Sequence, residues 1–226
     1  MKYLFLICLL SMIFVLEVQA QNRKENSEKP DYSPYYFHRV DHFEKLPDTD
    51  NEVFFLGNSI SDGCEWSEIF GDLRFKNRGI SGDITDGILY RLNQITRCKP
   101  KQVFLMIGIN DLARGRSVDY VVNNHLKIYN KIEKESPLTE VIVQSLLPVN
   151  NRYGLFSSHT NKGDSILEIN KQLKSICRDR GYVFVDLFSK MVNVDGKLRD
   201  DLSVDGIHLN GLGYLIWKKE IIGLTD

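Results

Sequence analysis

Three residues of the sequence have side chains that could together activate an oxygen nucleophile. Ser59 follows a short apolar run, and Asp205 stands three residues before His208 near the C-terminus. A histidine can take the proton of a serine hydroxyl, and an aspartate can fix the tautomer of that histidine and stabilise its charged form. Taken one at a time, these residues are more typical of a turn, a loop aspartate and a surface histidine.

Two further segments could stabilise the negative charge that develops during acyl transfer. Asn110 follows a continuous apolar stretch, and its side-chain amide could donate to an oxyanion, a contact worth about 2.7–4 kcal/mol. Gly82 has no side chain, so its backbone N–H could approach the same oxyanion. As alternatives, Asn-Asp is common turn chemistry, and Asp83 is predicted to cap the helix that follows it.

The hydrophobic pattern predicts a fold that brings these segments to one place. Short apolar strands are predicted at residues 53–56, 74–77, 102–107, 141–147 and 182–185, and helices at 66–70, 84–97, 118–132, 164–180 and 211–222. This alternation indicates a parallel sheet with helices on both faces. We therefore expect a three-layer α/β/α sandwich with a five-stranded parallel sheet, in which ligands bind at the carboxyl edge of the strands.

The N-terminus has the features of a secretory signal peptide. Met1-Lys2 precedes an apolar run at residues 3–16, and Ala20 offers a small residue for cleavage. This apolar run is shorter than a transmembrane helix normally requires. We expect cleavage after Ala20, a secreted or periplasmic protein, an N-terminal leader and packing helix at residues 21–50, and one domain at residues 51–226.

Composition argues against several classes of function. The formal net charge of the 226 residues is −1, so a nucleic-acid partner is not expected. The predicted mature chain keeps Cys64, Cys98 and Cys177, an odd number that excludes a complete disulfide framework and leaves any single pairing open. His38 and His42 have the spacing of two ligands on one helix face, but without a third ligand we expect surface histidines and no metal site. The sequence leaves the oligomeric state open.

Four blocks of the sequence, in this order, resemble the GDSL/SGNH hydrolase superfamily. They are Gly57-Asn58-Ser59, Gly79-Ile80-Ser81-Gly82-Asp83, Gly108-Ile109-Asn110-Asp111 and Asp205-Gly206-Ile207-His208-Leu209-Asn210. The resemblance extends from Val53 to about Leu215 and implies a flavodoxin-like fold. The first block of the family more often reads Gly-Asp-Ser. Asn58 therefore removes a charge beside Ser59 with little change of shape.

The resemblance also implies roles for individual residues. Ser59 would be the nucleophile, His208 the general base and Asp205 the residue that orients the base. The backbone N–H groups of Ser59 and Gly82, with the side chain of Asn110, would form the oxyanion hole. The implied reaction is hydrolysis of a carboxylic ester through an acyl-enzyme, and it needs neither a metal nor an organic cofactor.

The substrate is less closely defined. No large apolar insertion suggests a lid, which favours a small acyl group such as acetyl. The blocks resemble the branch that holds platelet-activating-factor acetylhydrolase-like proteins, lysophospholipases and carbohydrate O-acetylesterases, and we expect an acetylated carbohydrate such as sialic acid or xylan. Trp66 could line the acyl pocket, stack on a sugar or pack in the core. Arg114 and Arg116 could bind an anionic group or be solvated loop charges.

Two other functions stay open. The chain could be a lipid esterase of the lysophospholipase or platelet-activating-factor acetylhydrolase type, which would require an exposed apolar channel. It could also be a non-catalytic binding module of the same fold, or a flavin or phosphate binder, in which Ser59 only caps a helix. No G-x-G-x-x-G follows the first predicted strand, which disfavours a dinucleotide.

Overall fold

The computed structural model describes residues 32–225, so the predicted signal peptide lies outside the described residues. Five strands form a parallel sheet: β1 (Val53–Gly57), β2 (Phe75–Gly79), β3 (Gln102–Met106), β4 (Glu140–Gln144) and β5 (Val183–Val185). Their order across the sheet is β2-β1-β3-β4-β5. The predicted five-stranded parallel sheet is confirmed.

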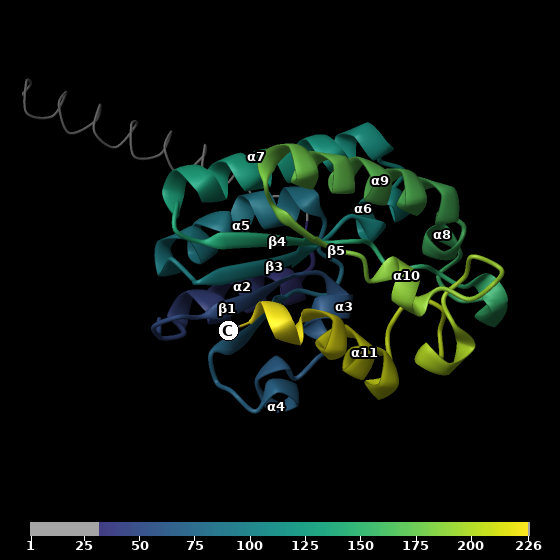
Figure 1. Ribbon diagram of the computed structural model, residues 1–226, viewed down its shortest axis with the longest axis horizontal. Coiled ribbons are helices and arrows are strands. Elements are labelled where there is room, and N and C mark those ends of the chain that lie inside the picture. Colours follow the sequence, from purple (N-terminus) through teal and green to yellow (C-terminus); the bar gives the residue numbers. More distant parts are fainter. Residues whose placement is uncertain (1–31, 226) are drawn as a thin grey trace, which may run out of the picture. The chain divides into compact units, whose positions relative to one another are not determined.

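Helices cover both faces of this sheet and complete the predicted three-layer sandwich (Figure 1). On one face α5 (Thr85–Cys98), α7 (Val118–Glu135) and α9 (Gly163–Arg180) pack in series. On the other face α4 (Trp66–Phe70) contacts α11 (Gly211–Ile221). The N-terminal helix α2 (Pro34–Lys45) packs against α5. The shorter elements are α3 (Ser59–Asp62), α6 (Ile109–Ala113), α8 (Ser157–Thr160), α10 (Phe188–Met191), η1 (Asn151–Tyr153), η2 (Asp200–Leu202) and η3 (Ile222–Leu224).

The register of the central strands sets the position of the loops that carry the predicted site. The last residue of β1, Gly57, pairs with Gly79 of β2 on one side and with Met106 of β3 on the other. The chain passes from β1 to β2 in one direction and then crosses back over β1 to β3, so β1 lies at the point where the strand order reverses. Loops diverge at such a point and leave room for a ligand.

A cluster of aromatic rings fills the core between the sheet and the α4–α11 layer. Phe55 of β1 stacks on Trp66 with ring centroids 3.6 Å apart and on Phe104 at 5.1 Å. Trp217 of α11 meets the edge of the Trp66 ring at 5.0 Å. Such pairs contribute about 1 kcal/mol each beyond the area that they bury. This cluster fixes α4, and with it the segment after Ser59, against the sheet.

Local sequence signals explain several element boundaries. The Ser117 side chain accepts a hydrogen bond from the Tyr120 backbone N–H and caps α7. Helix α9 ends at Gly181, whose φ of 73° lies in the left-handed region that favours glycine. Residues 150–163, for which the hydrophobic pattern predicted neither strand nor helix, contain η1 and α8. A helix of one turn has too few residues to show a period.

The described residues contain no disulfide: Cys64, Cys98 and Cys177 are free thiols. Burial raises the pKa of Cys64 and of Cys98 to about 12, so both thiols stay protonated at neutral pH.

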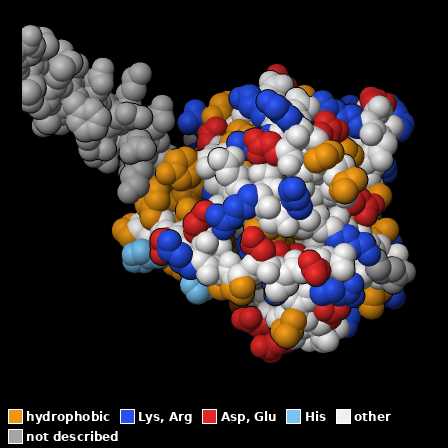
Figure 2. Space-filling view, turned by 90° about the vertical axis from the view of Figure 1, so that its left-hand side faces the viewer, with side chains coloured by type: hydrophobic (Ala, Val, Ile, Leu, Met, Phe, Trp, Pro, Cys, Tyr) orange, Lys and Arg blue, Asp and Glu red, His pale blue; other side chains and the backbone are white. Residues whose placement is uncertain are grey.

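None of the helices in residues 32–225 has both the length and the apolar character needed to cross a membrane. Basic and acidic side chains are intermixed on the face shown in Figure 2, in line with the near-neutral net charge.

Candidate active site

Ser59, His208 and Asp205 meet at the carboxyl edge of the sheet. Ser59 begins α3 directly after β1, and its Oγ lies 2.9 Å from Nε2 of His208. Nδ1 of the same imidazole lies 2.7 Å from Oδ2 of Asp205. When Nδ1–H donates to the carboxylate, the lone pair of Nε2 faces the serine hydroxyl and can accept its proton. The structure thus brings together three of the predicted site residues.

The carboxylate of Asp205 stays charged because of its hydrogen bonds. Burial works to raise its pKa, but the His208 backbone N–H, the His208 side chain and the Ile207 backbone N–H together lower that pKa below its ordinary value. Both backbone N–H groups donate to Oδ1, at 2.8 Å from His208 and 2.9 Å from Ile207. Oδ2 is therefore left for the imidazole, and a charged acceptor favours the imidazolium that forms when His208 takes a proton.

Gly57 and Asn58 hold Ser59 at the end of β1. A Cβ on Gly57 would lie 2.5 Å from the Met106 carbonyl oxygen, so a larger residue would push β1 away from β3. The Asn58 side chain accepts from the Ile60 backbone N–H at 3.0 Å and caps α3. Asn58 thus supplies the acceptor oxygen of an N-cap without a negative charge beside the nucleophile.

The loop that carries His208 is held by turn hydrogen bonds. Oγ of Ser203 accepts from the backbone N–H of Gly206 at 2.9 Å, and the backbone N–H of Asn150 donates to the Gly206 carbonyl at 2.8 Å. Gly206 has a φ of 88°, and a Cβ there would lie 1.9 Å from the Asn150 carbonyl oxygen. Only glycine allows this close approach of two loops.

Gly82 and Asn110 follow β2 and β3, and both lie at the carboxyl edge of the sheet. Gly82 is exposed and has a φ of 80°. Asn110 is buried in the first turn of α6, and its Nδ2 donates to the Asp83 carbonyl at 2.8 Å. Because an amide nitrogen carries two hydrogens, one hydrogen of Asn110 is available for a substrate oxygen. Backbone and side-chain N–H groups of this kind can stabilise an oxyanion.

A small enclosed cavity lies beside the three segments that carry Ser59, Asn110 and His208. Its volume is about 10 Å³, and its lining includes Asn58, Ile60, Ile109 and Ile207. Ile60 follows Ser59, Ile109 precedes Asn110, and Ile207 precedes His208. The neighbours of the three functional side chains therefore line one apolar space, which has room for about one water-sized group.

Buried charges lie behind this edge, and their arrangement corrects one prediction. Asp83 does not cap the first turn of α5 (Thr85–Cys98). Its Oδ1 accepts from the backbone N–H of Ile84, which precedes the helix, at 2.9 Å, and its Oδ2 pairs with Nε of Arg91 at 2.9 Å, with both side chains fully buried. Burial raises the pKa of Asp83 to about 6, against the opposing effect of Arg91. Asp111 supplies the cap instead, because its carboxylate accepts from the backbone N–H of Thr85 and, at 2.5 Å, from the Thr85 hydroxyl. Both carboxylates adjoin the start of α5, and sequence alone does not distinguish them.

Trp66 has no substrate-facing surface. Its side chain is 1% exposed, and Nε1 donates to the Ser61 carbonyl at 2.8 Å. The expectation that Trp66 could line an acyl pocket or stack on a sugar is therefore wrong, and its role is core packing. Arg114 is exposed, and its Nη2 donates to the Gly82 carbonyl at 3.0 Å, so it lies at the rim of the site. Arg116 instead lies over the Tyr120 ring.

His159 and Phe156 are site residues that the sequence patterns did not reveal. Nε2 of His159 lies 3.0 Å from Oδ1 of Asn110. The ring of Phe156 packs edge-on against His208, with centroids 5.4 Å apart, and against His159 at 5.9 Å. Both residues belong to the segment between the predicted strand at 141–147 and the predicted helix at 164–180. No family block, strand end or helical period marked this segment.

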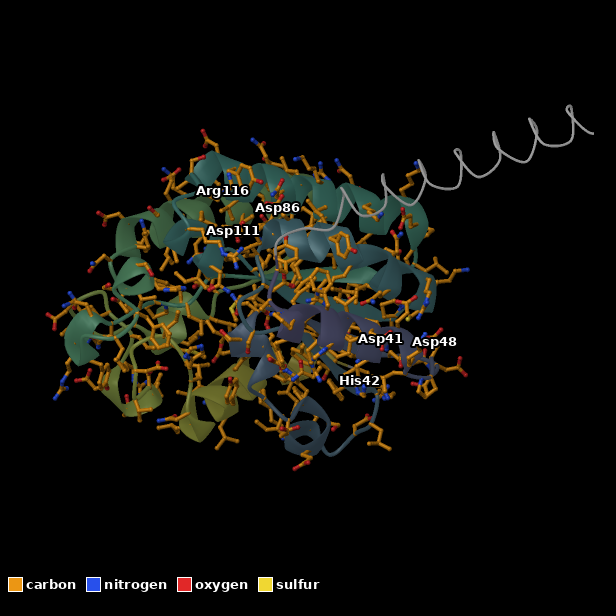
Figure 3. The ribbon with its side chains drawn as sticks, turned by 180° about the vertical axis from the view of Figure 1, so that it is seen from behind. Asp41, His42, Asp48, Asp86, Asp111 and Arg116 are labelled. Atoms are coloured by element: carbon orange, nitrogen blue, oxygen red, sulfur yellow. The ribbon has the colours of Figure 1, made fainter. Side chains whose placement is uncertain are left out.

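Within residues 32–225, one group of side chains has the composition of a metal site, and it lies elsewhere. Ligand atoms of Asp48, Glu52 and Cys98 lie within 4.8 Å of one another. Figure 3 shows Asp48 well away from Asp111. The Cys98 thiol donates to Asp48 at 2.9 Å and is protonated, which opposes metal binding. His38 and His42 are exposed on α2 and do not belong to this group.

Known proteins resemble the chain over most of its length. The family model described as GDSL-like Lipase/Acylhydrolase family matches residues 55–216. Platelet-activating factor acetylhydrolase IB subunit alpha1 of Rattus norvegicus is 30% identical over 178 residues, which cover 74% of this chain and 72% of the rat protein.

Solved structures resemble the fold. A GDSL-like lipase from Bacteroides thetaiotaomicron superposes with a TM-score of 0.72 at 23% identity, covering 84% of this chain and 96% of the other. A mutant acetyl-xylooligosaccharide esterase from Geobacillus gives a TM-score of 0.62 at 18% identity, covering 79% and 95%. At these identities the two structures support the three-layer architecture alone.

Proposed function

The chain belongs to the GDSL-like lipase/acylhydrolase family and is an ester-hydrolysing enzyme, and from this premise we propose that Ser59, His208 and Asp205 carry the reaction. The observation that carries the proposal is the continuous line of hydrogen bonds from Ser59 Oγ through the His208 ring to Asp205, at 2.9 and 2.7 Å. A serine that only capped a helix would not need a histidine oriented by a carboxylate.

The proposed reaction has two steps. Ser59 Oγ attacks the ester carbonyl carbon while His208 Nε2 takes the hydroxyl proton, and the tetrahedral oxyanion accepts hydrogen bonds from the Ser59 and Gly82 backbone N–H groups and from Asn110. The intermediate collapses, and the leaving alcohol takes the proton from His208. Water then attacks the acyl-enzyme while His208 takes a proton from it. The second tetrahedral intermediate collapses, His208 returns the proton to Ser59 Oγ, and the carboxylic acid is released.

The acyl group is proposed to be acetyl. The apolar cavity of about 10 Å³ is lined by Ile60, Ile109 and Ile207, the sequence neighbours of Ser59, Asn110 and His208, and its size suits a methyl group rather than an acyl chain. The platelet-activating factor relative is named an acetylhydrolase, and the xylooligosaccharide enzyme an acetyl esterase, so the two names share the acetyl group and differ in the alcohol.

For the alcohol, we propose a carbohydrate such as sialic acid or xylan. A predicted signal peptide would export the enzyme to the cell exterior or the periplasm, where acetylated glycans occur. The second candidate is a glycerolipid acetyl ester, which the 30% identity to the rat acetylhydrolase favours. Phe156, whose ring packs against His208 and is 44% exposed, would contact either alcohol.

A chain-length series of p-nitrophenyl esters tests the acyl group. We expect the acetyl ester to have the highest kcat/KM, with about a tenfold loss for the first added methylenes because the cavity has no room for them. Ser59→Ala, measured beside the wild type, reports the background. A preference for octanoyl over acetyl would contradict the small acyl pocket. Acetylated xylooligosaccharide, O-acetylated sialic acid and platelet-activating factor, compared at equal concentration, then distinguish the two alcohols.

A further inference from the structure

His159 contacts the amide that the proposed oxyanion hole uses. It lies on α8, and its Nε2 is 3.0 Å from Oδ1 of Asn110, although the two residues are 49 positions apart in the sequence. The other ring nitrogen, Nδ1, lies 3.1 Å from Oγ of the adjacent Ser158. The imidazole faces the carbonyl end of the Asn110 side chain, whereas the other histidine of the site faces Ser59.

The hydrogen bonds of Asn110 define where the protons lie. Nδ2 of Asn110 donates to the Asp83 carbonyl at 2.8 Å, since a flipped amide would set two oxygens against each other there. Oδ1 therefore faces His159, and Nε2 of His159 must carry the hydrogen. The Ser158 hydroxyl can then donate to Nδ1, which gives a chain of donors that runs from Ser158 through His159 to Asn110 and on to Asp83.

This chain leaves one hydrogen of the Asn110 amide for the substrate. The Asp83 carbonyl takes the first Nδ2 hydrogen, and the contact with His159 prevents rotation of the amide about its terminal torsion, which is otherwise broad. Donors linked in series also polarise one another, so the free N–H becomes a better donor to an oxyanion. Burial and then the proximity of His208 lower the pKa of His159, which favours the neutral ring.

We propose that His159 is a positioning residue of the oxyanion hole, which fixes the Asn110 amide so that its second Nδ2 hydrogen points at the carbonyl oxygen of the substrate. The inference rests on the proposed function, because it assigns His159 a part in the same reaction. It predicts that His159 affects the turnover step through Asn110 and has little effect on ground-state binding of the ester.

Replacement of His159 by Ala, Gln and Glu tests the donor role on p-nitrophenyl acetate. His159→Ala should lower kcat about tenfold, the effect of one lost hydrogen bond, with KM within about twofold. His159→Gln places an N–H near the position of Nε2 and should restore most of the activity. His159→Glu has the same length but no N–H, so it should resemble Ala or be slower. If Gln and Glu were equally impaired, the donor role would be wrong.

A double-mutant cycle with Asn110→Ala tests whether His159 acts through that amide. Asn110→Ala alone should lower kcat by about 10²–10³-fold. If His159 acts through Asn110, adding His159→Ala to that variant should cost less than about twofold, whereas independent roles would multiply the two losses. Multiplying losses, or wild-type kcat in His159→Ala, would overturn the inference.

Two controls separate this inference from the proposed function and from misfolding. His42→Ala removes an exposed histidine on α2 and should retain the wild-type kcat. Thermal unfolding of each variant shows whether α8 and the sheet remain folded. If Ser59→Ala abolishes hydrolysis while His159→Ala is fully active, only the role of His159 is wrong. If Ser59→Ala retains hydrolysis, the proposed function itself fails.

Discussion

The two sides of Ser59 are built differently. On the proton-transfer side, Asp205 and His208 lie on one loop three residues apart, and their side chains are 19% and 35% exposed. On the amide side, Gly82 and Asn110 follow different strands, and fully buried groups such as Asp83 and Arg91 lie behind them.

The difference matches the two chemical tasks. A base must pass a proton from Ser59 to the leaving alcohol and then take one from water, which requires access to solvent. Oxyanion donors are effective when they need no reorganisation during the reaction, which requires rigid support. We therefore expect changes on the proton-transfer side to affect activity with little effect on stability, and changes in the buried support of the amide side to affect stability first.

The largest effect is expected from Ser59→Ala or His208→Ala. Either change removes a member of the proposed catalytic unit and should lower kcat on p-nitrophenyl acetate by about 10⁶-fold. The midpoint of urea unfolding should stay near that of the wild type because both side chains lie at the edge of the fold. A variant that lost stability as well as activity would contradict the difference that we infer between the two sides of Ser59.

Asp205→Asn should have the next largest effect. The amide keeps the shape of the side chain but no longer stabilises the imidazolium and favours the wrong tautomer of His208, so kcat should fall by about 10⁴-fold near neutral pH. The measurement is kcat for the acetyl ester, with unfolding by urea as the control. Less than a tenfold loss would show that His208 is oriented without Asp205.

Arg91→Met tests the buried support of the amide side. The change leaves the Asp83 carboxylate buried without its charged partner and removes donors to the Gly57 and Arg78 carbonyls, at 3.3 and 2.8 Å. We expect a loss of about 3–5 kcal/mol in the free energy of unfolding.

Arg97→Met is the matched control for that change. Arg97 pairs with Glu44 at an exposed position, where an ion pair contributes about 0–1 kcal/mol. Urea denaturation should therefore separate the two arginines clearly. Equal losses would show that the ion pair behind the amide side is no more important than a surface pair.

The smallest expected effect is on the pH dependence of stability. It comes from His125 of α7, which also supports the amide side of Ser59. Its Nε2 lies 2.9 Å from the Ile107 carbonyl, and burial lowers its pKa to about 4. In the unfolded chain the ring binds a proton near pH 6.5, so the unfolded state gains protons first and stability falls as the pH drops from about 6.5 to about 4.

Replacement of His125 by Gln should remove this part of the pH dependence. Between pH 7 and pH 4, the wild type should lose roughly up to 3 kcal/mol more of its unfolding free energy than His125→Gln loses. Burial raises the pKa values of Asp83 and Asp111 to about 6, so these two carboxyl groups stabilise the folded state as the pH falls. Their contribution is the same in the wild type and in His125→Gln, so it cancels when the two proteins are compared. Parallel pH curves would mean that His125 does not titrate in this way.

The sequence predicted the parts of the molecule that follow from local pattern. Buried parallel strands are continuous apolar runs, so their positions and the edge that carries Ser59 were accessible, and the four blocks placed Asp205 and His208 at that edge. Contacts between side chains distant in the sequence were not accessible. Pattern alone could not show that Asp111 rather than Asp83 caps α5, that Trp66 turns into the core, or that His159 reaches Asn110 from a one-turn helix.

Labelling with a fluorophosphonate, followed by peptide mass spectrometry, tests most directly whether Ser59 is the nucleophile. A sample that hydrolyses p-nitrophenyl acetate should carry one adduct, on the peptide that contains Ser59, and should lose activity in proportion to its labelling. An active sample in which the label lies on another residue, or in which Ser59 stays unmodified while hydrolysis is blocked, would contradict the assignment.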